Sequence, residues 1–376
     1  MAGLPTVSVR RCRPLADDVA AVAVRLKRIE TTVALLDRVR PLNLIQELAR
    51  LTRGFEAGQC LQPDFVYAPR AQLSEARREL GELSKTLDAG DAEARLLGER
   101  ASELELEARL AEHVGEPAFA ALARERFPLP ATRDATARLA THFSTAQTPA
   151  KYAETAELLH DSSDARDPHS LWSELSRRVQ AERLAVRVEV VVGLVSLAAV
   201  ADGVVRVRAG ARLSASTAQR IALHEVEGHV RPRVSGHRLG GVFLAGSARA
   251  SEDEEGRAIL LEERAGFLDS ERRQELARRY WAAESLHGGA GFWDTVTLLG
   301  QRGATLASAI ELASRVHRGG GLGRELIYLV GYERVALALG RRPELEHVLV
   351  SGRIALDAAE ALLQGSIELD DDRNVV

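Results

Sequence analysis

The chain has 376 residues, and its 50 lysines and arginines against 54 aspartates and glutamates give a formal net charge of −4. This balance argues against a nucleic-acid-binding protein, which needs a basic surface. Only two cysteines occur, Cys12 and Cys60, so no disulfide framework is indicated and we expect a reducing, cytoplasmic compartment.

The amino-terminal half is predicted to be helical. The arginines at positions 10, 11 and 13 are not followed by an apolar segment of signal-peptide length. Residues 14–112 then place apolar side chains at helical spacing, interrupted at 54–69 by a proline- and aromatic-containing connection. A polar segment at 144–169 marks a soft boundary. It divides the chain into a mainly helical part (1–165) and a catalytic part (166–376), unless both form one integrated domain.

Beyond the boundary the pattern predicts a small β-sheet and further helices. Residues 184–192 and 203–207 are rich in valine with partial alternation, which is typical of strands. The most apolar stretch, 190–201, is too short for the roughly 20 residues of a membrane-spanning helix, so we expect it in the core and expect no membrane association. Later helices are broken by glycines at 319–321. The predicted fold class is α+β, mainly helical with a small sheet.

One predicted helix carries the residues with the clearest chemistry. Ser216 and Gln219 have the spacing of a capping box, and Pro232 is expected to limit the helix at its other end. Between them an apolar stripe predicts one buried face; its members are Leu223, Val226 and Val230.

His224 and His229 on this helix could hold a zinc ion, and Glu225 beside the first could act as the base toward a water on that ion. The two histidines are five residues apart, so an ideal α-helix would separate them by roughly 140°. A π-bulge would return them to one face. Gly228 is the position where such a distortion meets least resistance. Without it, the segment would be a surface helix whose His and Glu pair with neighbours.

Glu255 is the candidate third ligand, since a catalytic zinc commonly takes three protein ligands. It belongs to the acidic run 252–255, which opens another predicted helix. A different interpretation is equally open. Ser251 and Glu254 have capping-box spacing, and the helix dipole favours acids in a first turn without any metal.

Three segments together resemble a known family. They are HEVEGH at 224–229, EEGRA at 254–258 and RVHRGGGLGRELIYLVG at 315–331. Over nearly its whole length the chain is similar to the QEGLA-motif proteins. Bacterial members of that family were named flavohemoglobin expression modulators, and eukaryotic members include the microtubule-associated tyrosine carboxypeptidases.

The resemblance implies a zinc-peptidase-like core with an HExxxH helix, in which zinc is bound by His224, His229 and Glu255. It makes Glu225 the catalytic base and places Glu262 just outside the ligands. The chain departs from the family pattern at several positions. Glu227 and Gly228 replace Gly-Thr, Glu254 and Arg257 replace the Gln and Leu of QEGLA, and His317 replaces a tyrosine.

The implied reaction is zinc-dependent removal of residues from the C-terminal tail of a peptide or protein. Arg315, Arg318 and Arg324 could hold the free carboxylate by bidentate hydrogen bonds, although each could also be an ordinary surface arginine. Tyr328 and His317 could stabilise the oxyanion, although a buried tyrosine more often packs its ring.

Two other functions stay open. HEVEGH followed by EEGRA is also similar to the HELLGH and EECRAE motifs of dipeptidyl-peptidase III, an aminodipeptidase. The third possibility is a non-catalytic regulatory protein that keeps the zinc. The presence of Glu225 and only three candidate ligands favours a catalytic site over a structural one.

Overall fold

The computed structural model describes residues 17–88, 91–146, 158–201 and 203–364, together with the backbone of two short strands at 7–10 and 368–371. Cys12, Arg11, Arg13 and the middle of the segment 144–169 lie outside the described residues. No helix in the described ranges is long and apolar enough to cross a membrane.

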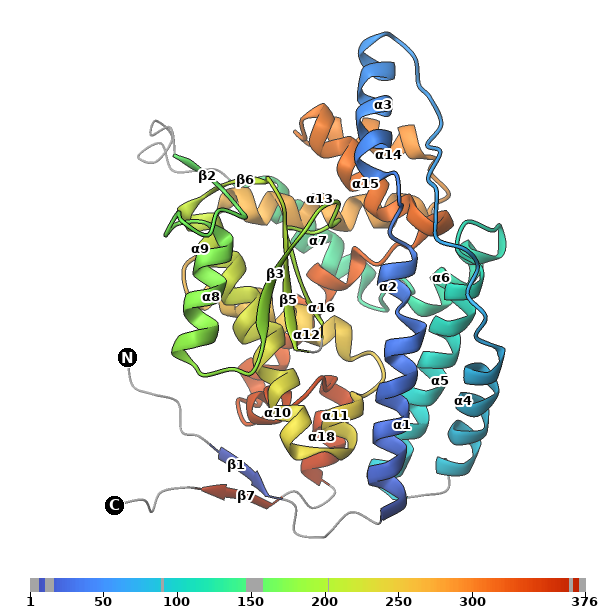
Figure 1. The fold of residues 1–376 in the computed structure, drawn as a ribbon, viewed down its shortest axis with the longest axis vertical. Helices are drawn as coiled ribbons and strands as arrows, with labels where there is room; N and C mark the ends of the chain where they lie inside the picture. Colours follow the sequence, from blue (N-terminus) through green and yellow to red (C-terminus); the bar gives the residue numbers. More distant parts are fainter. Residues whose placement is uncertain are drawn as a thin grey trace.

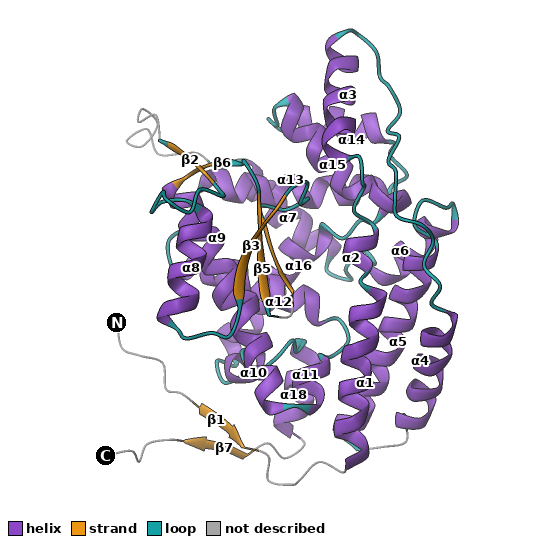
Figure 2. Ribbon diagram, in the orientation of Figure 1, coloured by secondary structure: helices purple, strands orange, loops and turns teal. Residues whose placement is uncertain are grey.

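The described chain is mainly helical with a little sheet, which confirms the predicted fold class (Figures 1 and 2). The helices of the amino-terminal half are α1 (Asp17–Val33), α2 (Leu35–Arg38), α3 (Leu44–Glu56), α4 (Ser74–Leu87), α5 (Ala92–Glu112), α6 (Ala118–Arg126) and α7 (Arg133–Ser144). Those that follow are α8 (Leu171–Ala181), α9 (Ala215–Leu223), the π-helix η2 (His224–Val230), α10 (Arg231–Leu239), α11 (Gly241–Ala245), α12 (Ala250–Arg264), α13 (Ser270–His287), α14 (Phe292–Gln301), α15 (Leu306–Gly321), α16 (Leu326–Arg341), α17 (Leu345–Leu349) and α18 (Leu356–Gln364).

The largest sheet has three strands in the order β3-β5-β4, where β3 (Arg187–Val191) and β5 (Val204–Arg208) run parallel and β4 (Ala198–Ala201) is antiparallel to β5. The valine-rich strands were therefore predicted correctly. Two antiparallel pairs are smaller; they join β2 (Leu159–Asp161) to β6 (Arg212–Ser214), and β1 (Val7–Arg10) to β7 (Glu368–Asp371).

The apolar stretch 190–201 is not core as a whole, which corrects the prediction. Val190 is 46 % exposed and Val192 is 74 % exposed, whereas Leu194 and Ala198 are buried. Val190 lies in β3, an outer strand of the sheet, and Val192 follows it. Only part of the stretch can therefore reach the interior.

Two hydrophobic cores support the fold. The larger one joins helices of the amino-terminal half to α11–α18. Within it Glu30 of α1 accepts hydrogen bonds from Arg100 of α5, at 2.6 Å, and from Arg353, which lies 323 positions later. The smaller core lies between α8, α9, η2 and the three-stranded sheet. The division of the chain at residue 165 stays a prediction.

The helix η2 belongs to the smaller core through Val226 and Val230, while α12 belongs to the larger one through Ile259 and Leu260. The two helices therefore meet where the two cores join. Both candidate metal-binding motifs lie on them.

A close approach of two backbones fixes α12 against α16. A Cβ atom on Gly256 would lie 2.1 Å from the carbonyl carbon of Gly331, and one on Gly331 would lie 2.0 Å from the carbonyl oxygen of Glu252. Only glycine permits such contact. These two glycines, from the EEGRA and IYLVG segments, bring the acids of α12 next to the residues at the start of α16.

Candidate metal centre

The HEVEGH segment forms a π-helix over its whole length, with the following Val230 included. This confirms the predicted distortion, since the wider turn returns His224 and His229 to one face. Their ring centroids are 5.1 Å apart and both side chains are buried. The helix is therefore not at the surface, as the alternative predicted, although both histidines do lie against neighbouring glutamates.

The ends of this helical region differ from the prediction. Ser214, not Ser216, caps α9, because its side chain accepts a hydrogen bond from the amide of Thr217. Pro232 does not end the helix either, since it lies in the first turn of α10. Because α10 continues η2 without a break, Pro232 lies inside one long helical segment, where its missing N–H leaves a preceding carbonyl without its helical donor.

The π-turn and Pro232 leave backbone carbonyl oxygens without their usual helical N–H donors, and Arg257 of α12 supplies hydrogen-bond donors in their place. Its Nη2 donates to the carbonyl oxygens of Glu227 at 2.5 Å and Gly228 at 3.0 Å. A Cβ atom on Gly228 would lie 2.6 Å from the Cβ of Ala258. Gly228 is thus required by tight packing on α12 as well as by the distortion, and Arg257 holds the same contact in place.

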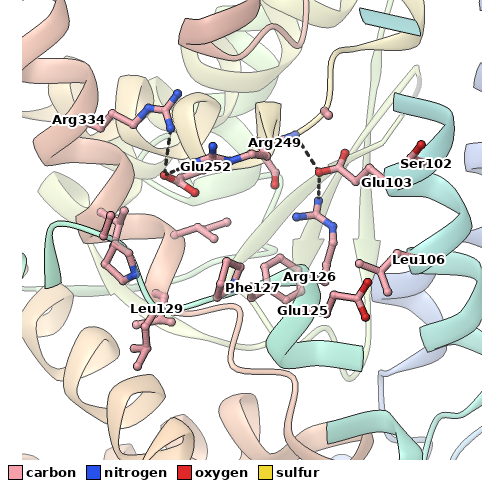
Figure 3. Close-up of a pocket in the computed structure, with 18 of the residues that line it drawn as sticks. Ser102, Glu103, Leu106, Glu125, Arg126, Phe127, Leu129, Arg249, Glu252 and Arg334 are labelled. Atoms are coloured by element: carbon pink, nitrogen blue, oxygen red, sulfur yellow. Dashed lines mark hydrogen bonds and ion pairs between the residues drawn. The ribbon is translucent and has the colours of Figure 1, made fainter. Parts of the chain in front are cut away.

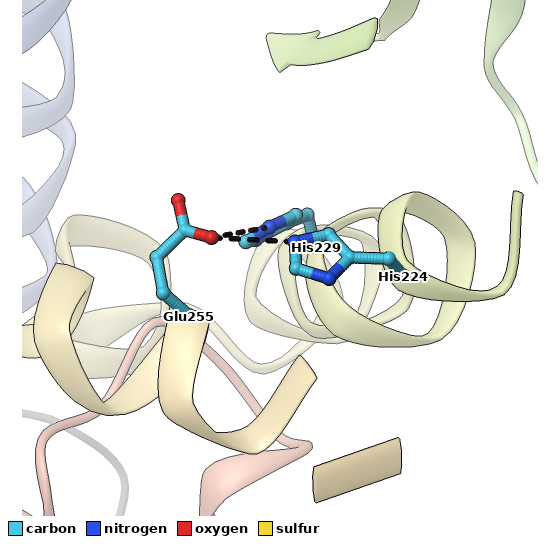
Figure 4. Close-up of side chains that lie close together, drawn as sticks. All are labelled: His224, His229 and Glu255. Atoms are coloured by element: carbon cyan, nitrogen blue, oxygen red, sulfur yellow. Dashed lines mark hydrogen bonds and ion pairs between the residues drawn. The ribbon is translucent and has the colours of Figure 1, made fainter. Parts of the chain in front are cut away.

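Glu255 completes a cluster with the two histidines (Figure 4). Its Oε2 lies 3.2 Å from Nε2 of His224 and 3.6 Å from Nε2 of His229. One ligand atom from each of the three residues lies within 4.8 Å of the others. Two imidazole nitrogens and a carboxylate are a donor set that zinc favours. In the part of the chain that the structure describes, this is the one group of three or more His, Cys, Asp or Glu side chains that could hold a metal ion.

The other nitrogen of His224 is fixed by Glu262, whose Oε1 lies 2.6 Å from Nδ1. Glu262 is fully buried and accepts two hydrogen bonds from Arg272, at 2.8 and 2.9 Å. Such carboxylate–histidine pairs set the ring orientation and increase the basicity of metal ligands. Glu262 therefore lies where the resemblance implied, directly behind one histidine.

Glu254 has the corresponding position behind His229. Its Oε1 lies 3.1 Å from Nδ1, although the pair lacks good hydrogen-bond geometry and Nδ1 has no other partner among the described residues. Arg233 donates to the same carboxylate at 2.7 Å. The capping-box interpretation of Ser251 and Glu254 is wrong, because Ser251 lies inside α12 and the cap position is Arg249.

Burial and charge act together on the titration of these groups. Burial alone would raise the pKa of Glu255, but the neighbouring histidines and Arg324 hold it well below its usual value. Burial alone would lower the pKa of His229, but Glu254 and Glu255 raise it to about 10. The acids are therefore ionised, and the site attracts positive charge.

Glu225 differs from these acids. It is buried, and burial raises its pKa, partly offset by His229 and His224. A carboxylate with a raised pKa beside two histidines has the properties of a general base.

Arg324 and Tyr328 lie next to the cluster. Arg324 donates from Nη2 to Oε1 of Glu255 at 3.0 Å and from Nη1 to the hydroxyl of Tyr328 at 3.2 Å. The guanidinium of Arg279 lies over the ring of Tyr328, 4.6 Å from its centroid. The structure thus brings Arg324 into contact with the metal-binding group, and Tyr328 is linked to that group through Arg324.

The remaining predicted residues do not contact the cluster. Arg315 forms an ion pair with Glu325 at 3.0 Å. His317 places Nε2 within 2.9 Å of the hydroxyl of Thr295, and among the described residues no hydrogen bond or ion pair joins it to the metal-binding group. Arg318 is buried in the glycine-rich break of α15.

A cavity of about 1330 Å³ is separate from this site (Figure 3). It is bounded by α4, α5, the segment after α6, the start of α12, and α16; Glu103, Arg126, Arg249 and Arg334 are among its lining residues. None of the predicted site residues lines it.

Sequence comparison adds one match. The sequence model of a family described as microtubule-associated tyrosine carboxypeptidase matches residues 53–368, which include all three motifs. No curated protein and no solved structure matches the chain.

Proposed function

Because the chain belongs to the microtubule-associated tyrosine carboxypeptidase family, which implies carboxypeptidase-type activity on a peptide or protein, we propose that it is a zinc-dependent metallocarboxypeptidase. The observation that carries the proposal is the convergence of both Nε2 atoms on Glu255 while Glu262 and Glu254 lie behind the two Nδ1 atoms. This is the arrangement expected of a catalytic zinc site with histidine ligands.

His224, His229 and Glu255 would hold the zinc ion. When bound, zinc polarises a peptide carbonyl and lowers the pKa of a coordinated water to about 7. Three protein ligands would leave a coordination position open, as in catalytic zinc sites.

Glu225 is the proposed general base. In a buried site its carboxylate can accept a proton from the attacking water and return it to the nitrogen of the leaving amino acid. The raised pKa of Glu225 favours the first of these transfers, because its carboxylate then binds a proton more readily than that of an exposed glutamate.

Tyr328 is the proposed donor to the developing oxyanion. Its oxygen accepts a hydrogen bond from Arg324, so its own proton stays available for a substrate oxygen. His317 stays a prediction for this role, since its ring is turned to Thr295.

The substrate is proposed to be the C-terminal tail of a peptide or protein. The family description names tyrosine as the residue removed, and a peptide ending in tyrosine is therefore the first substrate to test. Arg315, Arg318 and Arg324 are the proposed candidates for its carboxylate.

The decisive experiment measures bound zinc and peptide cleavage with and without Glu225→Gln. We expect the variant to keep its zinc and to lose turnover by about 10²–10⁴-fold, the usual contribution of general acid–base catalysis. Cleavage should require a free carboxylate on the peptide and tolerate an acetylated amino terminus. Release of dipeptides from the amino end of an amidated peptide would instead support the aminodipeptidase, and zinc binding without any cleavage would support a regulatory protein.

A further inference from the structure

The three arginines near the glycine-rich break differ in whether they already have a partner. Arg315 forms hydrogen bonds with Glu325 at 3.0 and 3.2 Å, and Glu325 is only 1 % exposed. Arg324 is held by Glu255 and Tyr328. Both guanidinium groups are therefore engaged within the protein.

Arg318 has no such partner. It is 7 % exposed, its Nε is buried without a hydrogen bond, and in the described ranges no ion pair involves it. Burial, together with the charge of Arg315, lowers the pKa of Arg318 to about 10. The charge of Glu325 offsets this shift only in part, since Glu325 is bound by Arg315. A buried cation without a hydrogen-bonded anion is unfavourable, and such groups are normally paired. A ligand that carries an anion would supply the missing partner.

The backbone holds Arg318 in a defined position. The helical conformation ends at Arg318 (φ −55°, ψ 150°), and Gly319 and Gly320 follow with φ of 73° and 111°. Gly319 donates its amide hydrogen to the hydroxyl of Tyr67 at 2.7 Å, and a Cβ atom there would lie 2.7 Å from Phe119. Only glycine fits this turn. The break therefore fixes where the Arg318 side chain leaves the helix.

Arg324 links this position to the metal-binding group. Its charge acts on Arg318, and its guanidinium contacts Glu255 directly. A carboxylate on Arg318 would therefore lie in the same region as the proposed catalytic residues. A guanidinium suits it, because its fork of donors matches both carboxylate oxygens.

We propose that Arg318, rather than Arg315 or Arg324, binds the free C-terminal carboxylate of the substrate and so makes the site selective for chain ends. The inference rests on the proposed function. It assigns Arg318 a specificity-determining role and leaves Arg315 and Arg324 as residues that hold Glu325, Glu255 and Tyr328.

The test uses binding, so that it does not depend on turnover. A short fluorescent peptide ending in tyrosine is prepared with a free carboxylate and as its amide, and its anisotropy is measured with zinc-loaded Glu225→Gln. Adding Arg318→Gln should weaken binding of the free acid by about 10- to 150-fold, the range for hydrogen bonds to charged groups. Binding of the amide should not change.

Arg70→Gln is the matched control, because Arg70 lies in an exposed ion pair with Glu116 near Tyr67. It should leave both affinities unchanged. Thermal unfolding separates a structural effect from the proposed one. Removing an unpaired buried charge should keep or raise the melting temperature, and Arg318→Lys offers a second variant that keeps the charge and loses the fork.

The outcomes separate the two proposals. If Arg318→Gln preserves the preference for the free acid, or if the parent binds acid and amide equally, the assignment of Arg318 is wrong whatever the activity. If Arg318→Gln abolishes the preference for the free acid but the unsubstituted chain cleaves no peptide, the proposed carboxylate site is supported and the proposed peptidase activity is wrong. If the Arg318→Gln single variant cleaves peptides and still prefers the free acid as strongly as the unsubstituted chain, the proposed peptidase activity is supported and the role proposed for Arg318 is wrong.

Discussion

Two helices lose regular α-geometry at the site, and they do so in different ways. In η2 the chain stays helical but widens, and Arg257 donates hydrogen bonds to the carbonyl oxygens of Glu227 and Gly228. In α15 the regular helix stops at Arg318, and among the described residues no side-chain hydrogen bond or ion pair holds the guanidinium at this break.

The difference separates two tasks. A metal site needs ligands that are held rigidly before the ion arrives, because poorly fixed ligands reduce metal affinity. A substrate site needs an unpaired charge that the ligand completes, since an arginine already bound to an acid has little to offer. The π-helix thus serves the metal, and the break in α15 is proposed to serve the substrate.

Two single variants give the strongest test of whether the metal site and the proposed substrate site are separate. Glu255→Ala should reduce zinc affinity by more than the roughly 10- to 100-fold that changes behind the ligands produce. Arg318→Ala should leave zinc affinity unchanged, because Arg318 does not contact the ligands. Competition with a chromophoric chelator measures both. Equal zinc loss in the two variants would mean that the regions are not separate.

Zinc affinity should also depend steeply on pH. In the metal-free chain the acids raise the pKa of His224 and raise that of His229 to about 10, so His229 is protonated near pH 7 and His224 holds its proton more firmly than a free histidine does. Zinc must displace these protons, and affinity should rise by up to about 100-fold per pH unit where two protons are released. Titrations from pH 6 to about 8 with proton-release measurements would check this slope.

The raised pKa values of the histidines also determine whether the metal-free chain gains or loses stability as pH rises. A histidine whose pKa is raised on folding stabilises the metal-free fold below its unfolded pKa, near 6.5. That contribution disappears as pH rises through the folded pKa, so the metal-free chain should lose stability between about pH 6.5 and 10. Metal-free protein that becomes more stable over this window would contradict the assigned pKa values.

Packing of η2 gives a smaller effect. Gly228→Ala would force a Cβ to within 2.6 Å of Ala258, and overpacking of this kind destabilises by about 1–3 kcal/mol. Gly340→Ala is the control, since a Cβ there meets nothing within 4 Å and the position is exposed in α16. Chemical denaturation should show a loss only for the first variant, and zinc affinity should fall with it.

The smallest expected effect is that of Arg257→Leu, which restores the leucine of the QEGLA pattern. It removes the donors to two carbonyls, but it also removes a buried cation whose pKa burial lowers. These contributions oppose each other, so we expect a net loss of about 1 kcal/mol. A loss of several kcal/mol by denaturation would show that Arg257 alone maintains the π-turn.

Much of this site could be predicted from local pattern. The five-residue spacing of His224 and His229 forces a π-turn if they are to share a face, and the structure has one. Glu255 followed from its motif. The partners of the arginines could not be predicted from local pattern. Whether a carboxylate lies against Arg315, Arg318 or Arg324 depends on how α12, α15 and α16 pack.

Local rules also failed where several residues could satisfy them. Ser214 and Ser216 are both competent caps, and β6, which ends at Ser214, decides between them. Glu254 obeys the spacing of a capping box with Ser251, yet it lies behind His229 because α12 starts at Ala250. Arg257 acts on backbone about 30 positions away, which no local pattern reports.

The contact between Glu30 and Arg353 has a consequence for the timing of folding. The two residues are 323 positions apart, and at a synthesis rate of about 5–20 residues per second Arg353 is made roughly 16–65 s after Glu30. α11 and the later helices of the larger core are translated only after α1, in the course of that interval or directly after it. The larger core therefore cannot close while its first helices leave the ribosome, and their apolar faces lack these partners until the last helices are made.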